Sequence, residues 1–187
     1  MKFKIFLFLA SAVALASCVD IPDFSDTPKI GYNGISQYTQ TDSTTGALQE
    51  AEIVTVTVNF EDGDGDLGLT SAQIQDPAYT QTYKKVPNWG LLANYELVTM
   101  IKQKDGSFRE AILSGDSSKF FPDLKPDGKP GPIKGKLDLN IRFLKSRSAV
   151  PTTVKFRVRI MDRGYHISET FTGEPVITDE VIVPMLQ

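Results

Sequence analysis

Cysteine and histidine are almost absent from this sequence of 187 residues, which contains one of each, Cys18 and His166. A single cysteine excludes an internal disulfide, and these two residues cannot assemble a zinc site of the usual cysteine and histidine type. A serine hydrolase would have to use His166, and no G-x-S-x-G segment supports such a site. We therefore expect neither a disulfide-stabilised fold nor catalysis through His166.

Basic clusters are absent as well. The chain has 20 lysines and arginines against 23 aspartates and glutamates, which gives a formal net charge of −3 at pH 7. Binding to nucleic acid depends on a concentrated positive charge facing the phosphates. We therefore expect no nucleic acid among the partners of this protein.

Long apolar runs are missing except at the start of the chain, where residues 5–15 carry no charge and follow Lys2 and Lys4. The run is shorter than the roughly 20 residues that cross a bilayer as a helix, and small residues follow it, as in a secretory signal peptide. Its end, Leu15-Ala16-Ser17-Cys18, resembles the lipobox of bacterial lipoproteins. This resemblance implies that residues 1–17 are removed and that Cys18 is acylated, which anchors the protein to a membrane.

The chain after the signal divides into a short tether and one domain. Residues 18–28 contain two prolines, three aspartates and no periodicity, which predicts a lipidated acidic tether. Residues 29–187 are long enough to bury a core, and one domain is the default at this length. Removal of Lys2 and Lys4 with the signal lowers the net charge of the mature chain to about −5.

Three segments alternate apolar and polar residues with period two, the pattern of half-buried strands. They cover residues 54–60, 137–143 and 154–160. Weaker strands are expected over 29–36, 95–102, 108–113 and 176–184, with a break near Asp179 in the last. Asp105-Gly106 predicts a hairpin turn. Residues 71–93 are either a short helix or a long loop, and residues 115–135, with four prolines, are a long irregular connection.

This pattern predicts an all-β fold. About seven short strands joined by turn-rich links are typical of an antiparallel β-sandwich of immunoglobulin or fibronectin III type. A small β-barrel is the alternative. The outward faces that carry Lys155, Arg157 and Arg159 are either solvated or a site for an anionic ligand.

An acidic, glycine-rich loop follows the first strong strand. Asp62, Asp64 and Asp66 alternate with glycines that permit tight turning. Calcium is bound by six to eight oxygen atoms, and three converging carboxylates supply much of that number. The loop is not an EF-hand, because Leu67 and Gln73 replace the required glycine and glutamate. It is either a calcium site with Asp62, Asp64 and Asp66 as ligands or an acidic turn without metal.

The lipobox and the acidic loop together resemble a group of small Bacteroidetes lipoproteins. The resemblance covers residues 15–18 and the strand with its Asp-Gly-Asp-Gly-Asp-Leu-Gly loop, residues 53–68, and includes more loosely the strand end Met161-Asp162-Arg163. It implies a lipid-anchored β-domain on the outer membrane, facing either the periplasm or the cell surface. It implies no particular reaction.

Aromatic side chains suggest one contact surface. Trp89 lies in an expected loop, with Tyr79 and Tyr83 close in sequence. Exposed aromatic rings stack on sugars and anchor protein partners. The alternative is that Trp89 fills one end of the core.

The sequence supports two functions of different classes. The first is a non-catalytic envelope protein, a binding or accessory module for an unknown protein or glycan partner, with calcium as its only expected cofactor. The second is a small envelope hydrolase that acts on glycan or peptide through a carboxylate pair that the sequence does not identify.

Lipidation is directly testable at Cys18. We expect Cys18→Ser to leave the protein unprocessed or released from the membrane, because the acyl chains are added to this thiol. Mass spectrometry of the mature N-terminus measures the acyl groups in the wild type. A free, unmodified N-terminus at any residue would contradict the prediction.

Overall fold

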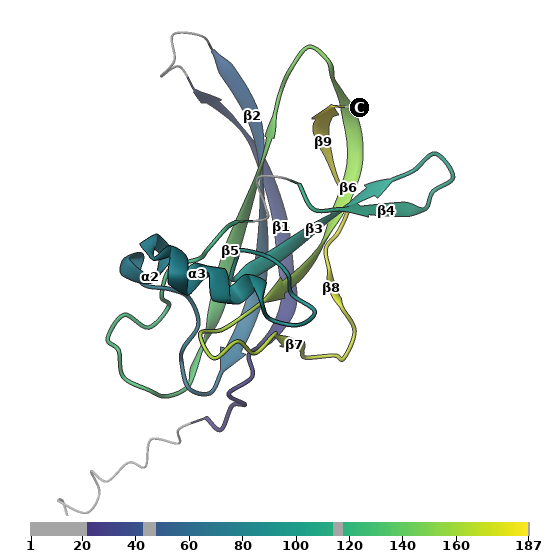
Figure 1. Ribbon diagram of the computed structural model, residues 1–187. Helices are drawn as coiled ribbons and strands as arrows, with labels where there is room; N and C mark the ends of the chain where they lie inside the picture. Colours follow the sequence, from purple (N-terminus) through teal and green to yellow (C-terminus); the bar gives the residue numbers. More distant parts are fainter. Residues whose placement is uncertain (1–21, 43–47, 114–117, 187) are drawn as a thin grey trace, which may run out of the picture.

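The computed structural model describes residues 22–42, 48–113 and 118–186 (Figure 1). The signal sequence and Cys18 lie outside these residues. Within them the chain forms nine strands and two short helices. The strands are β1 (Lys29–Asp42), β2 (Gln49–Asp62), β3 (Tyr95–Lys102), β4 (Phe108–Ala111), β5 (Ile133–Leu144), β6 (Ala149–Ile160), β7 (Glu169–Thr170), β8 (Val176–Ile177) and β9 (Val181–Leu186); the helices are α2 (Ser71–Gln75) and α3 (Pro77–Lys84).

The strands form two sheets that pack together, which confirms the predicted β-sandwich. One sheet has the order β5-β2-β1-β7, and the other has the order β4-β3-β6-β8, with β9 also paired to β6. All pairs are antiparallel except the two-residue contact of β1 with β7. β2 and β6 lie in different sheets, and Asp62 at the end of β2 lies close to Asp162, just beyond the end of β6, where the two sheets meet (Figure 1).

The three strongly alternating segments form β2, β5 and β6, as predicted. Their apolar faces supply most of the main core. Within the alternating segments, side chains on the opposite faces are polar and remain at least partly exposed, whereas Ala51 and Ile53 earlier in β2 are buried on that face. The main core includes Val54, Val56, Val58, Leu139, Ile141, Phe156, Val158 and Ile160.

A second, smaller core lies beneath the helices. Its buried members are Leu69, Tyr83, Trp89 and Met161. Both helices have local N-terminal caps, since Thr70 forms a capping box with Gln73, and Asp76 caps α3 ahead of Pro77. The segment 71–93, for which the sequence left a helix or a loop open, therefore contains two short helices and a turn.

Two local predictions are confirmed, and a third holds for most of its range. The hairpin falls at Asp105-Gly106, where Gly106 has φ +85°. The last strand is broken into β8 and β9 around Asp179. The proline-rich connection, predicted over residues 115–135, lacks a strand from 118 to 132, but β5 begins at Ile133.

Part of the expected tether contacts the domain. Ser25 O accepts a hydrogen bond from Gly63 N–H, and Pro28 is buried.

No helix among the residues described here is long and apolar enough to cross a membrane.

The main core makes a direct stability prediction. Ile141 is 1 % exposed, and Ile141→Ala should reduce the free energy of unfolding by about 2–4 kcal/mol, because it removes packed methylene groups and leaves a cavity. Ile182, on β9, is 60 % exposed, so Ile182→Ala is the matched control and should change stability by less than about 0.5 kcal/mol. Urea denaturation measures both, and equal losses would contradict the assigned core.

Candidate metal centre

The acidic loop begins where β2 ends. Asp62 is the last residue of β2, and the backbone N–H of Asp66 donates to Asp62 Oδ2 at 3.0 Å and to Asp64 Oδ1 at 3.2 Å. These two bonds fold the loop back over the strand end. Gly65 and Gly68 have φ values of +74° and +88°, which side chains rarely adopt, so the alternating glycines are what permits this turn.

The rest of the loop is fixed by burial and by backbone pairing. Leu67 lies in the main core and Leu69 in the second core. Leu67 O and Leu69 O accept hydrogen bonds from Leu124 N–H and Asp123 N–H, and Asp64 O accepts one from Gly131 N–H. The proline-rich connection therefore forms one wall of the loop and limits how far the carboxylates can move apart.

A third carboxylate arrives from the other sheet. Asp162 lies two residues beyond the end of β6, in a turn where His166 N–H donates to Asp162 Oδ1 at 2.7 Å. The His166 ring contacts Asp162 Oδ2 at 2.9 Å, and Tyr83 O–H donates to the Asp162 carbonyl at 3.1 Å. The second core thus holds this turn in place.

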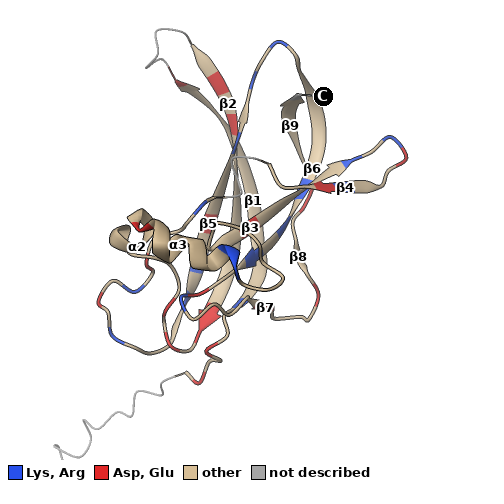
Figure 2. Cartoon of the chain, in the orientation of Figure 1, with Lys and Arg blue, Asp and Glu red and all other residues tan. Residues whose placement is uncertain are grey.

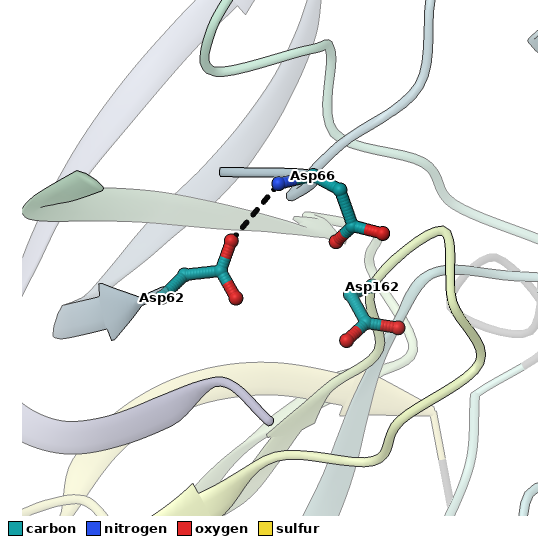
Figure 3. Close-up of side chains that lie close together, drawn as sticks. All are labelled: Asp62, Asp66 and Asp162. Atoms are coloured by element: carbon teal, nitrogen blue, oxygen red, sulfur yellow. Dashed lines mark hydrogen bonds between the residues drawn. The ribbon is translucent and has the colours of Figure 1, made fainter. Parts of the chain in front are cut away.

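Asp62, Asp66 and Asp162 point toward one another (Figure 3). Each offers one carboxylate oxygen, and these three oxygens lie within 4.8 Å of one another. Asp62 and Asp162 are buried, with 0 % and 1 % exposure, and Asp66 is half-buried. Asp62 Oδ1 and Asp66 Oδ1 are buried and accept no hydrogen bond from the part of the chain that the structure describes.

The electrostatics of this cluster are unfavourable without a counter-charge. Burial, and then the charges of Asp64, Asp66 and Asp162, raise the pKa of Asp62 to about 7. Burial also raises the pKa of Asp162 to about 6 and raises that of Asp66. His166 is paired with Asp162, and no ion pair to Asp62 occurs among the described residues. Arg163 and the backbone N–H groups of Arg163 and Gly164 partly offset the charge of Asp66, and Asp62 is the carboxylate without such a partner among the described residues. A buried carboxylate without a counter-charge, beside two others, is suited to binding a cation.

The oxygen-only donor set fits calcium better than other common metals. Calcium accepts carboxylate, carbonyl and water oxygens in a flexible geometry, whereas zinc and copper sites use histidine or cysteine. The three carboxylates each offer one oxygen to the centre of the cluster. Backbone carbonyls and water would complete the usual coordination number.

The structure brings together two of the three predicted ligands. Asp62 and Asp66 belong to the cluster, whereas Asp64 lies outside it and accepts from Asp66 N–H. Asp162 is the third member of the cluster, and the sequence marks it only as part of the strand end Met161-Asp162-Arg163. To identify Asp162 as a ligand, one would have to know that it lies just beyond the end of β6, in the sheet that faces β2.

The predicted aromatic contact surface is wrong for two of its three members. Trp89 and Tyr83 are buried in the second core, and Tyr79 is half-buried against it. Trp89 Nε1 donates to Ala93 O at 2.8 Å, so its polar atom is satisfied inside the protein. The rings pack because the helices and the turn after α3 close over this end of the sandwich.

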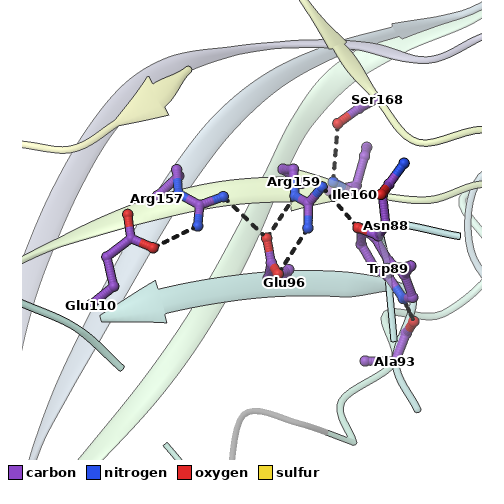
Figure 4. Close-up of polar contacts among 9 residues, drawn as sticks. All are labelled: Asn88, Trp89, Ala93, Glu96, Glu110, Arg157, Arg159, Ile160 and Ser168. Carbon is purple, nitrogen blue, oxygen red and sulfur yellow. Dashed lines mark hydrogen bonds and ion pairs between the residues drawn. The ribbon is translucent and has the colours of Figure 1, made fainter. Parts of the chain in front are cut away.

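The cationic face of β6 is neutralised within the fold (Figure 4). Glu96 is buried and accepts from Arg159 Nε at 2.6 Å and Nη2 at 2.9 Å. Arg157 lies 3.5 Å from Glu96 and 2.9 Å from Glu110. The guanidinium groups of Arg157 and Arg159 therefore already have carboxylate partners within the protein. Their presence on this face does not require an external anion.

The alternative of a hydrolase gains no support from these groups. Ser168, the serine nearest His166 in sequence, accepts a hydrogen bond from Ile160 N–H at 3.1 Å. A glycosidase needs two carboxyl groups that a sugar can reach. Asp62 and Asp162 are buried, so the group of three carboxylates that they form with Asp66 does not offer a pair that a glycan can reach.

Comparison with known proteins found no matching family model, no similar curated protein and no similar solved structure.

The raised carboxyl pKa values predict how the cation-free protein responds to pH. Asp62 has a pKa of about 7 in the folded chain against an ordinary value of 3.8. The folded state therefore binds more protons at Asp62 than the unfolded state does between these values, so the contribution of Asp62 to stability is greatest below about pH 4 and is lost as pH rises to about 7. His166, whose pKa is raised by Asp162, acts in the same direction.

The measurement is the free energy of unfolding in chelator, by urea denaturation at several pH values. A single group contributes a slope of at most about 1.4 kcal/mol per pH unit. Asp62→Asn removes one such group and should flatten the fall. Identical slopes for the variant and the wild type would show that Asp62 does not titrate in this range.

Proposed function

We propose that this protein is a non-catalytic, lipid-anchored module of the outer membrane, stabilised by a calcium ion bound by Asp62, Asp66 and Asp162. The cation is inferred from the state of Asp62 Oδ1. This buried carboxylate oxygen has no hydrogen-bond partner among the described residues and lies near two further carboxylates. An unpaired buried polar atom costs about 1–3 kcal/mol, and more when it is charged. A bound cation removes that cost.

Calcium is preferred over magnesium for a geometric reason. Magnesium requires a nearly ideal octahedron with oxygens at about 2.0–2.1 Å and retains several waters. Here two ligands lie on a loop and one on a turn of the facing sheet, and two of the three are closed off from solvent. Such a site accommodates longer, irregular bonds more readily than a compact octahedron.

The site is structural rather than catalytic, because the ion would lie between the sheets. Asp62 is the last residue of β2, and Asp162 lies two residues beyond the end of β6. An ion held by both connects the two layers of the sandwich. A buried ion has no open position for a substrate, in contrast to catalytic metal sites.

The anchor and the location rest on the sequence. The apolar start followed by Leu15-Ala16-Ser17-Cys18 supports lipidation, and extracytoplasmic compartments supply calcium at concentrations that even weak sites bind. In this proposal the domain presents its surface to a protein or glycan partner. Affinity capture from solubilised membranes through a C-terminal tag identifies that partner.

Calcium binding predicts a specific pattern of melting temperatures. At a hundredfold excess over its dissociation constant, an ion that binds only the folded state adds about 2.7 kcal/mol, or about 5–10 °C for a domain of this size. Asp162→Asn should abolish this shift and should raise the melting temperature in chelator, because it removes a repelling charge. Differential scanning calorimetry in calcium, magnesium and chelator measures these values.

Asp64→Asn is the matched control, because it removes a charge from the same loop without removing a ligand. It should retain most of the calcium shift. Equal melting temperatures of the wild type in calcium and chelator, or a shift that persists in Asp162→Asn, would contradict the site.

A further inference from the structure

The described start of the chain lies against both segments that supply the carboxylates. Ser25 O accepts from Gly63 N–H at 2.9 Å, and Gly63 directly follows Asp62. Pro28 O accepts from Glu169 N–H at 2.9 Å, and Glu169 follows the turn that contains Asp162 and His166. Figure 2 shows acidic residues of the chain start close to the acidic end of β2.

Gly63 is packed closely against this segment. A Cβ atom on Gly63 would overlap the carbonyl oxygen of Phe24 and lie 2.9 Å from Asp26 Oδ1. The close fit requires glycine at this position. It also brings the Asp26 carboxylate next to a loop that already carries three aspartates.

From these contacts we propose that the bound cation controls docking of residues 22–28, the segment between the lipid anchor and the first strand. The inference rests on the proposed cation site and adds a regulatory role to it. With the ion bound, the acidic loop and the Asp162 turn are drawn together, and both hydrogen-bond donors for the segment, Gly63 N–H and Glu169 N–H, are held in position. Without the ion, repulsion among the carboxylates, with Asp26 beside them, favours release.

Few contacts hold the segment, which is why a local change can release it. Ser25 and Asp26 are exposed, Phe24 is half-buried, and only Pro28 at its end is buried. Segments with few buried contacts open at low free-energy cost without global unfolding. Stabilisation of the loop by an ion is therefore large relative to the free energy of docking.

Release would change the distance between the domain and the membrane. Covalent geometry limits the span from Cys18 to Pro22 to about 14 Å, and the span from Cys18 to Lys29 to about 35–40 Å. Docking therefore holds the domain close to the lipid, and loss of the ion allows it to move outward. Calcium would set the reach and orientation of the domain.

The test uses the full mature lipoprotein in detergent, and chymotryptic cleavage of the Phe24–Ser25 bond, quantified by mass spectrometry. Cleavage requires the segment to leave the loop. With calcium at ten times its dissociation constant, a fully coupled opening is about tenfold rarer than in chelator, so cleavage should slow by about that factor. Isothermal titration calorimetry measures calcium binding separately on the same sample.

Two variants separate docking from ion binding. Gly63→Ala displaces the segment without altering a carboxylate, so calcium should still bind while cleavage becomes rapid with and without the ion. Gly34→Ala is the matched control, because a Cβ there meets no atom within 4 Å, and it should behave as the wild type does. Asp162→Asn should lose both calcium binding and the protection of Phe24.

The outcomes distinguish the two proposals. Calcium binding in calorimetry with unchanged cleavage at Phe24 would overturn the coupling and leave the cation site standing. Absence of calcium binding would overturn both. Protection that persists in Gly63→Ala would show that the segment is held by something other than the acidic loop.

Discussion

Mutual repulsion of three carboxylates at the seam between the sheets is the constraint on which the surrounding structure depends. Asp62 ends a strand of one sheet, and Asp162 follows a strand of the other. Closing the sandwich therefore forces their charges together. The neighbouring contacts resist that repulsion: Leu67 and Leu69 bury the loop on one side, and Tyr83 holds the Asp162 turn on the other.

Glu96 shows how the same fold satisfies a buried carboxylate from within. Its two oxygens accept hydrogen bonds from Arg159, and Arg157 adds further positive charge (Figure 4). Asp62 is buried as deeply, and among the described residues the N–H of Asp66 is its one hydrogen-bond donor. This contrast between a neutralised carboxylate and one without a counter-charge is the observation behind the proposed cation.

The strands were the most predictable part of the fold. Over residues 54–60, 137–143 and 154–160 of β2, β5 and β6, apolar buried residues alternate with polar, more exposed ones, because one face of each segment lies against the core. Of the two alternatives for Trp89, the structure confirms the one in which it fills one end of the core, and Tyr83 is buried beside it. Residue type alone does not reveal whether a loop closes over the core or extends from it. The extended β1 was under-predicted because its outer half pairs with β2 while exposing most of its side chains.

The sequence by itself determined the all-β class, through period-two alternation, and the presence of an acidic turn, through three aspartates spaced by glycines. The sequence also contains the lipobox-like segment, which can be identified from consecutive residues without knowledge of the fold. The tertiary structure alone decided that Asp162, and not Asp64, joins Asp62 and Asp66, and that residues 24–28 lie on the loop. The physical reason is that alternation specifies which face of a strand is buried, whereas strand order and sheet packing specify which strand ends meet.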